Sequence, residues 1–131
     1  MCNLTSFLPA DLGLIEVERK RFTVKISSPA RAVMECLYLA PKYQPLLEVF
    51  ELMESLNNLR PAIVQKLLEE CTSIKVKRLF LYLADKAGHE WFNFIDLDKV
   101  DLGSGKRSIV SGGTYVAKYQ IMVPKELEAV I

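Results

Sequence analysis

The chain has 131 residues, of which 50% are hydrophobic and 25% are charged. These values are typical of one globular domain that builds its core without disulfides or a metal, so we expect residues 1–131 to form a single domain. The formal net charge of +1 excludes a protein that is basic over its whole surface, although it leaves room for a local basic patch.

The first part of the chain predicts a β-hairpin. Residues 14–17 and 22–26 are expected to be its strands, and the second of these alternates apolar and polar side chains, as a strand with one buried face does. The charged run over residues 18–21 is expected to form the turn. It has none of the glycine signals of a tight two-residue turn.

Helices are expected to follow this hairpin. Ser28 can accept a hydrogen bond from the first helical turn and Pro29 needs no N–H there, so both mark a helix start. Gly88 marks the end of another helix as a left-handed cap. The expected helices cover residues 29–39, 45–56, 61–71 and 74–87, with a short fifth helix over residues 91–95. In the third, the residues expected to face the core are Ile63, Val64, Leu67, Leu68 and Cys71.

The last part of the chain predicts a second hairpin. Its arms are residues 107–110 and 118–123, and residues 111–114 form the turn. Strands at both ends with helices between them predict an α+β fold. We expect one small antiparallel or mixed sheet, formed by the N- and C-terminal hairpins together, with about four helices packed on one face.

Several features predict a cytoplasmic protein. The number of cysteines is odd, and their spacing fits neither a disulfide framework nor a zinc site; they are Cys2, Cys36 and Cys71. Residues 1–9 have neither the basic start nor the long apolar run of a signal peptide. No apolar stretch is long enough to span a bilayer, so no membrane partner is expected.

No motif indicates a metal, a cofactor or a catalytic residue. His89 is the only histidine and has no metal-ligand partner at a suitable spacing, so we expect a structural role such as capping the next helix. The segment over residues 103–108 resembles a phosphate-binding loop only in part. Val100 stands where that motif needs glycine, and Arg107 where it needs serine or threonine, which disfavours nucleotide hydrolysis. Backbone N–H groups beside Lys106 and Arg107 could still contact phosphate.

Basic residues gather in short groups, the first over residues 19–25. Lysine and arginine side chains supply most of the sequence-independent affinity for nucleic acid. The candidate residues for binding nucleic acid or another target are Lys75, Lys77, Arg78, Lys106 and Arg107.

Two alternatives remain open. A small metal-dependent enzyme acting on nucleic acid or nucleotides could use acidic residues. The groups available to it are Asp96, Asp98 and Asp101, or Asp11 with Glu18 and Lys20. A scaffold or dimerisation domain could instead use exposed apolar residues of the helix over residues 46–56.

Three segments carry a resemblance to a known family. They are VKISSPARA over residues 24–32, VKRLFL over residues 76–81, and DLGSGKR over residues 101–107 with KYQI over residues 118–121. In order and spacing they resemble the C-terminal part of the AbiEi family, the antitoxins of type IV toxin–antitoxin systems that act in abortive phage infection. The resemblance extends from about Phe7 to Leu127.

The resemblance implies a non-enzymatic bacterial antitoxin. Full members carry an N-terminal winged helix-turn-helix domain that binds DNA and represses their operon. Their C-terminal domain counters a nucleotidyltransferase-like toxin, which the antitoxin is expected not to contact directly. The present chain is expected to start just before the first strand of that C-terminal domain, which puts its own promoter recognition in doubt.

Overall fold

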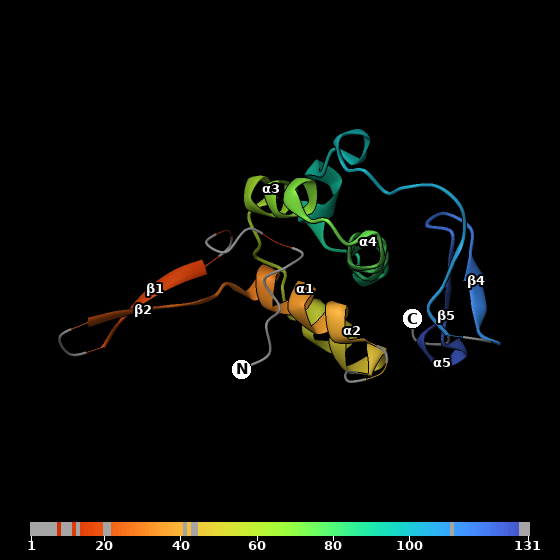
Figure 1. Ribbon diagram of the computed structural model, residues 1–131, viewed down its shortest axis with the longest axis horizontal. Coiled ribbons are helices and arrows are strands. Elements are labelled where there is room, and N and C mark those ends of the chain that lie inside the picture. The colour runs from red at the N-terminus through yellow and green to blue at the C-terminus, as the bar shows by residue number, and fades with distance from the viewer. Residues whose placement is uncertain are drawn as a thin grey trace.

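The computed structural model describes residues 8, 12, 14–19, 22–40, 42, 45–110 and 112–128, with the backbone alone for 14–19 and 22–27. Helix α4 (Ile74–Ala87) lies at the centre, and α1 (Pro29–Leu39) and α2 (Leu46–Glu54) pack against it. Strands β1 (Leu14–Arg19) and β2 (Phe22–Ser27) extend away from the helices at one end of the molecule (Figure 1). The C-terminal strands lie at the other end.

Helix α1 begins where the sequence predicts it. The Ser28 hydroxyl oxygen accepts a hydrogen bond from the N–H of Arg31 at 3.5 Å, and Pro29 stands in the first turn. The Arg31 side chain is buried, and its Nε lies 3.3 Å from a carboxylate oxygen of Glu35. Its Nη1 also donates to the carbonyl oxygen of Leu12. A carboxylate of the same helix therefore balances the buried charge of Arg31.

Helix α4 has both of its predicted ends and forms the axis of the core. The Ser73 hydroxyl oxygen accepts a hydrogen bond from the N–H of Val76 at 3.2 Å, and Gly88 ends the helix at a φ of 74°. All residues from 76 to 84 are buried, because other elements cover the helix on several sides.

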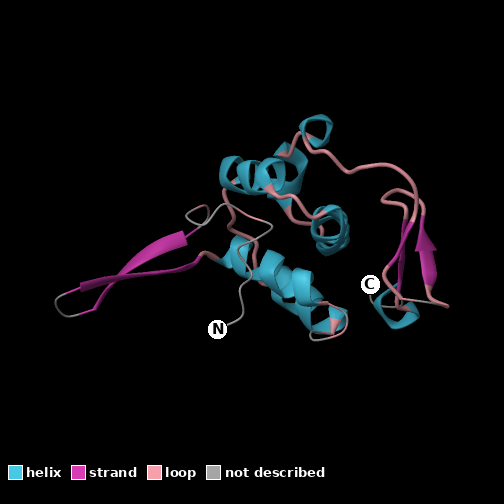
Figure 2. Ribbon diagram, in the orientation of Figure 1, coloured by secondary structure: helices cyan, strands magenta, loops and turns pink. Residues whose placement is uncertain are grey.

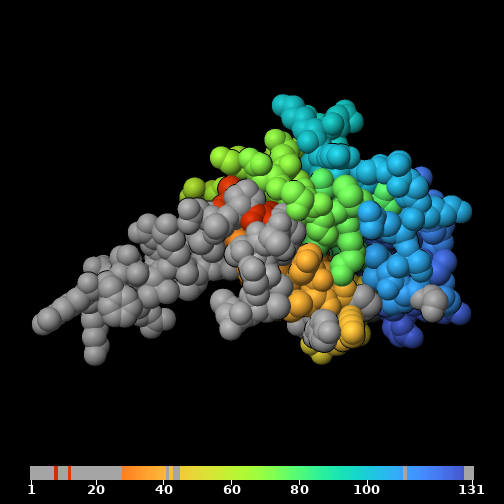
Figure 3. All heavy atoms as spheres, in the orientation of Figure 1, coloured from red at the N-terminus to blue at the C-terminus, as the bar shows by residue number. Residues whose placement is uncertain are grey.

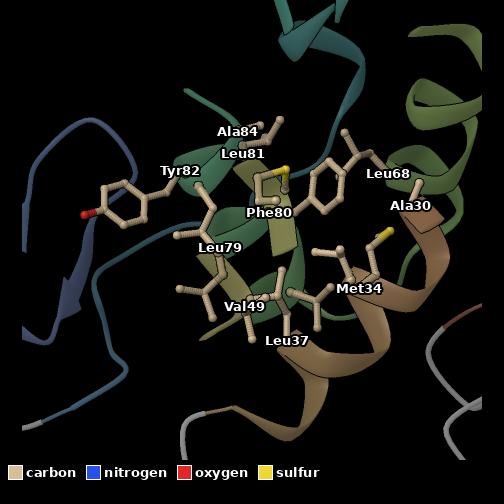
Figure 4. Close-up of a cluster of buried hydrophobic side chains, with 14 of the residues drawn as sticks. Ala30, Met34, Leu37, Val49, Leu68, Leu79, Phe80, Leu81, Tyr82 and Ala84 are labelled. Carbon is tan, nitrogen blue, oxygen red and sulfur yellow. The ribbon is translucent and has the colours of Figure 1, made fainter. Parts of the chain in front are cut away.

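The core gathers around α4. Figure 4 shows Met34 of α1 and Val49 of α2 in one cluster with Leu79 and Phe80. Tyr82, in the same helix, points out of this cluster toward the C-terminal strands (Figure 4). Helix α4 therefore joins the helical core to the C-terminal sheet.

The outer helix α3 (Pro61–Glu70) buries a narrower stripe than predicted. Val64, Leu67 and Leu68 are buried as expected, but Ile63 is 44% exposed, so its placement in the core was wrong. The reason is that α3 lies at the edge of the helical body (Figure 1) and buries one stripe of its surface, formed by Val64, Leu67 and Leu68.

Two short 3-10 turns follow α4. Residues 90–94 form η2 (Glu90–Phe94) in place of the predicted fifth helix, and η3 (Leu97–Lys99) comes after it. Within η2 the indole N–H of Trp91 donates to the carbonyl oxygen of Leu56 at 2.7 Å. This bond satisfies a carbonyl just beyond the end of α2, where no helical partner exists.

The strands form two separate sheets, one at each end of the molecule (Figure 2). Strands β1 and β2 pair antiparallel, with Leu14 opposite Ser27. The second sheet is mixed, so the α+β class with a small mixed sheet is confirmed. The prediction that both hairpins join in one sheet was wrong, because the helices stand between them and each hairpin pairs locally.

The C-terminal sheet also differs from the predicted hairpin. Strand β5 (Ile121–Val123) lies between β3 (Arg107–Ser108), which is parallel to it, and β4 (Thr114–Val116), which is antiparallel. Ile121 and Val123 are fully buried, which favours the central position for β5. Gly113 permits the close approach of β4, because a Cβ atom there would stand 2.0 Å from the carbonyl oxygen of Val123.

The chain then turns into α5 (Lys125–Glu128), whose Leu127 is buried. No helix in the described part of the chain is both long and apolar enough to cross a lipid bilayer.

Candidate nucleic-acid interface

The five basic residues predicted to bind a target fall in two places. Lys75, Lys77 and Arg78 stand on α4, while Lys106 and Arg107 stand at the start of β3. The loop before β3 and the C-terminal strands form one continuous surface, blue in Figure 3, beside the green surface of α4. The two places therefore adjoin at this end of the molecule.

Arg78 is a buried link between α4 and the C-terminal sheet. Its side chain is 2% exposed. The Nε atom donates to the carbonyl oxygen of Leu102 at 2.8 Å, and Nη1 donates to those of Gly105 at 2.8 Å and Gln120 at 3.2 Å. These three bonds hold the loop that leads into β3. Arg78 therefore positions Lys106 and Arg107, whose backbone follows directly.

The two candidate lysines of α4, Lys75 and Lys77, also point inward. The Lys75 ammonium donates to the carbonyl oxygens of Tyr38 at 3.0 Å and Ala40 at 2.5 Å, where α1 ends. A cation at the C-terminus of a helix is favourable, although burial lowers the pKa of this lysine. Lys77 is buried as well.

Lys106 and Arg107 are both exposed and follow each other in the chain. Their backbone is anchored, since the N–H of Arg107 donates to the carbonyl oxygen of Gln120 at 2.9 Å. The Lys106 Nζ lies 5.2 Å from the ring centroid of Tyr115, and Tyr115 is 40% exposed. Lys106 and Tyr115 together offer a cation and an aromatic face to a ligand, as surfaces that bind nucleic acid do, and Arg107 adds a second exposed cation next in the chain.

Two residues in this part of the molecule, Tyr115 and Lys118, were not among the candidate residues predicted from the sequence. Tyr115 lies on β4, which was predicted to be part of a connection rather than a strand. Lys118 is exposed and its Nζ lies 2.7 Å from a carboxylate oxygen of Asp85. Over residues 118–123, side chains that face the core alternate with side chains that face away from it, and Lys118 is one of the latter. This alternation could have added Lys118 to the candidate basic residues.

Two buried tyrosines form a polar seam between α4 and the C-terminal part of the chain. The hydroxyl of Tyr119 donates to a carboxylate oxygen of Asp85 at 2.9 Å, and the hydroxyl of Tyr82 donates to Glu128. Burial, and then the hydrogen bond and charge of the carboxylate, raise the pKa of both phenols well above the ordinary value. A cavity of about 230 Å³ opens beside this seam.

Folding stability is expected to fall as the pH rises above about 10, the pKa of an unfolded tyrosine. The raised pKa in the folded state means that the stabilisation is complete below that pH and is lost as the pH rises through the folded pKa. Urea unfolding of the natural chain and of Tyr119→Phe between pH 8 and pH 11 measures this. The variant is expected to show a shallower decline.

The matched control for this series is Tyr115→Phe, because the Tyr115 ring stands on the exposed face of the sheet. It is expected to keep the slope of the natural chain. Equal slopes for the natural chain, Tyr119→Phe and Tyr82→Phe would contradict the assignment of the alkaline loss to this seam.

The acidic residues of the enzyme alternative serve local turns. Asp96 accepts a hydrogen bond from the N–H of Asp98 at 3.1 Å, and Asp101 accepts one from the N–H of Gly103 at 2.9 Å. Among the described residues no group of three potential ligands could hold a metal ion. Of the second acidic group, Asp11 and Lys20 lie outside the described residues, and the side chain of Glu18 is likewise not described.

His89 has a structural contact rather than a capping one. Its Nε2 lies 2.5 Å from the carbonyl oxygen of Met53, and its ring stacks on Trp91 with centroids 5.5 Å apart. It stands at the N-cap of η2, but its side chain makes no cap hydrogen bond there. The histidine therefore joins η2 to the end of α2.

Apolar side chains are exposed on α2, as the dimerisation alternative requires. Leu47 is 40% exposed and Leu52 is 47% exposed. Leu52 also lines a small groove of about 140 Å³ with Val33 and Cys36 of α1. Nothing in the described residues covers this groove, so dimerisation stays a prediction.

Comparison with known proteins gives a match to a family model. The model is described as "Transcriptional regulator, AbiEi antitoxin, Type IV TA system" and matches residues 2–124, which is nearly the whole chain. A search of curated proteins and a search of solved structures give no significant match.

Proposed function

The chain belongs to the AbiEi family of antitoxins and transcriptional regulators of type IV toxin–antitoxin systems, and from this premise we propose that it counters a nucleotidyltransferase-like toxin without enzymatic activity. The family match carries the proposal. The local roles of Asp96 and Asp101 support the non-enzymatic part, because these carboxylates are engaged by backbone N–H groups. We further infer that residues 1–131 act as one domain in the cytoplasm.

We propose that Lys106 and Arg107 contact nucleic acid and that this contact, rather than a grip on the toxin, carries the antitoxin effect. Both side chains are exposed, and the Lys106 ammonium lies next to the aromatic ring of Tyr115. Phosphate contacts by two cations give affinity that depends on salt and little on sequence. Arg78 holds the loop before this surface from within α4, so its part in the proposed site is to position Lys106 and Arg107. Lys75, which is half-buried, and Lys77, which is buried, are not part of the proposed contact surface.

Co-expression with the toxin encoded beside this chain tests the proposal. The natural chain is expected to restore growth, and the double variant Lys106→Glu/Arg107→Glu is expected to lose both rescue and DNA binding. Lys66→Glu/Lys99→Glu is the matched control, because both lysines are exposed and lie outside the proposed surface. This control changes the net charge equally and is expected to keep rescue.

Two outcomes would contradict the proposal. Rescue by the Lys106→Glu/Arg107→Glu variant, shown to be folded by circular dichroism, would mean that these cations are not needed. Co-purification of the chain with the toxin would mean that direct contact carries the effect.

A further inference from the structure

Arg78 carries a buried charge without a carboxylate to balance it. Both Arg31 and Arg78 are almost fully buried, but Arg31 pairs with Glu35. In the described part of the chain no carboxylate forms an ion pair with Arg78, whose three hydrogen bonds all go to backbone carbonyl oxygens. Buried charges in proteins are as a rule paired, so the environment of Arg78 lacks an anion.

One nitrogen of this guanidinium, Nη2, makes no hydrogen bond with the described residues. The three hydrogen bonds use Nε and Nη1. No nitrogen of Arg78 is among the described side-chain atoms that are shut off from solvent and make no hydrogen bond. The Nη2 of Arg78 therefore keeps contact with solvent even though most of the side chain is covered.

The solvent space beside Arg78 is a cavity of about 160 Å³. Gly103, Ala117, Lys118 and Gln120 line it together with Arg78. The volume is roughly five times the share of one water molecule in the liquid, which is room for a small anion and its waters. Lys118 adds a second positive charge, although its partner Asp85 offsets part of it at 2.7 Å.

We propose that this cavity is a phosphate-binding site in which the Nη2 of Arg78 donates to a phosphate oxygen. A guanidinium is a strong donor to phosphate, and the bound anion would supply the charge that the protein does not. The phosphate can come from a nucleic-acid end or backbone, a source that rests on the proposed function, or from a small free phosphate compound. In either case the site is distinct from the exposed pair Lys106 and Arg107.

Ala117 allows a test that leaves the contacts of Arg78 intact, since its side chain is exposed on the cavity wall. Ala117→Asp places a negative charge in the cavity, and Ala117→Asn has nearly the same shape without the charge. Calorimetric titration with pyrophosphate is expected to show binding by the natural chain and by Ala117→Asn. Ala117→Asp is expected to bind at least about tenfold more weakly, through repulsion at close range.

The NMR signal of the Arg78 Nε–H group gives a local readout, which is expected to shift on titration in the natural chain. No shift and no heat with pyrophosphate would overturn the site, and so would equal affinity of Ala117→Asp and Ala117→Asn. A ten-nucleotide oligothymidylate with and without a 5′-phosphate identifies the source. Dependence on the 5′-phosphate indicates a nucleic-acid end, equal binding of the two indicates the backbone, and binding of pyrophosphate but neither oligonucleotide indicates a free compound.

The site and the proposed function can fail separately. Pyrophosphate binding with no rescue of growth would leave the site in place and remove the antitoxin proposal. If the natural chain did not bind pyrophosphate, and both it and Ala117→Asp restored growth, the phosphate site would be removed and the antitoxin proposal would stand.

Discussion

Replacing Arg78 with methionine is expected to lower the free energy of unfolding by about 3 kcal/mol. The variant loses three hydrogen bonds from a charged donor, each of which contributes about 1.5–3 kcal/mol, and part of that loss is offset because no charge has to be buried. Urea unfolding measures the change. The effect is expected to be large because the carbonyl oxygen of the half-buried Leu102 would lose its bond to a charged donor.

Arg107→Met is the control for Arg78→Met, because the Arg107 side chain is exposed at the neighbouring loop. It is expected to change stability by less than about 0.5 kcal/mol. Hydrogen exchange adds a local readout, since Arg78→Met is expected to speed exchange of the Arg107 N–H, which is bonded to Gln120. A stability change as small as that of the control would contradict the structural role of Arg78.

The second large effect is expected at Trp91, the only tryptophan. Trp91→Ala is expected to lower the free energy of unfolding by about 3–5 kcal/mol, because it opens a cavity where a large buried ring stood. The ring packs against Phe80 with centroids 6.1 Å apart, and its N–H donates to the carbonyl oxygen of Leu56. Thermal unfolding followed by circular dichroism measures the loss.

Two further variants separate packing from hydrogen bonding at Trp91. Trp91→Phe keeps an aromatic ring but removes the donor to Leu56, and is expected to cost about 1–3 kcal/mol. Phe94→Ala, in the same turn η2, removes a ring that is 69% exposed and is expected to change little. If Phe94→Ala lowered the free energy of unfolding as much as Trp91→Ala does, the buried ring of Trp91 would not be the main source of stability in η2.

The sequence did not predict which basic residues of the candidate site are exposed and which are buried. Five basic residues stood out by charge alone, and charge does not tell which side chains reach solvent. On α4, Arg78 faces inward because carbonyl oxygens of the loop before β3 and of Gln120 meet it there. Those acceptors lie up to 42 residues away in sequence, so no local pattern could indicate them. Tyr115 was missed for a related reason, since β4 has three residues and depends on its pairing with β5.

By itself the sequence determined the four long helices, α1 to α4, and the class of the fold. Ser28, Pro29, Ser73 and Gly88 start and end helices through bonds and backbone angles within a few residues, and such signals are complete in a local stretch of chain. The tertiary structure alone decided that the strands form two sheets, that β5 is central, and that Arg78 is buried while Lys106 is exposed. Strand order and burial depend on contacts between distant segments, and those contacts exist only once the chain has packed around α4.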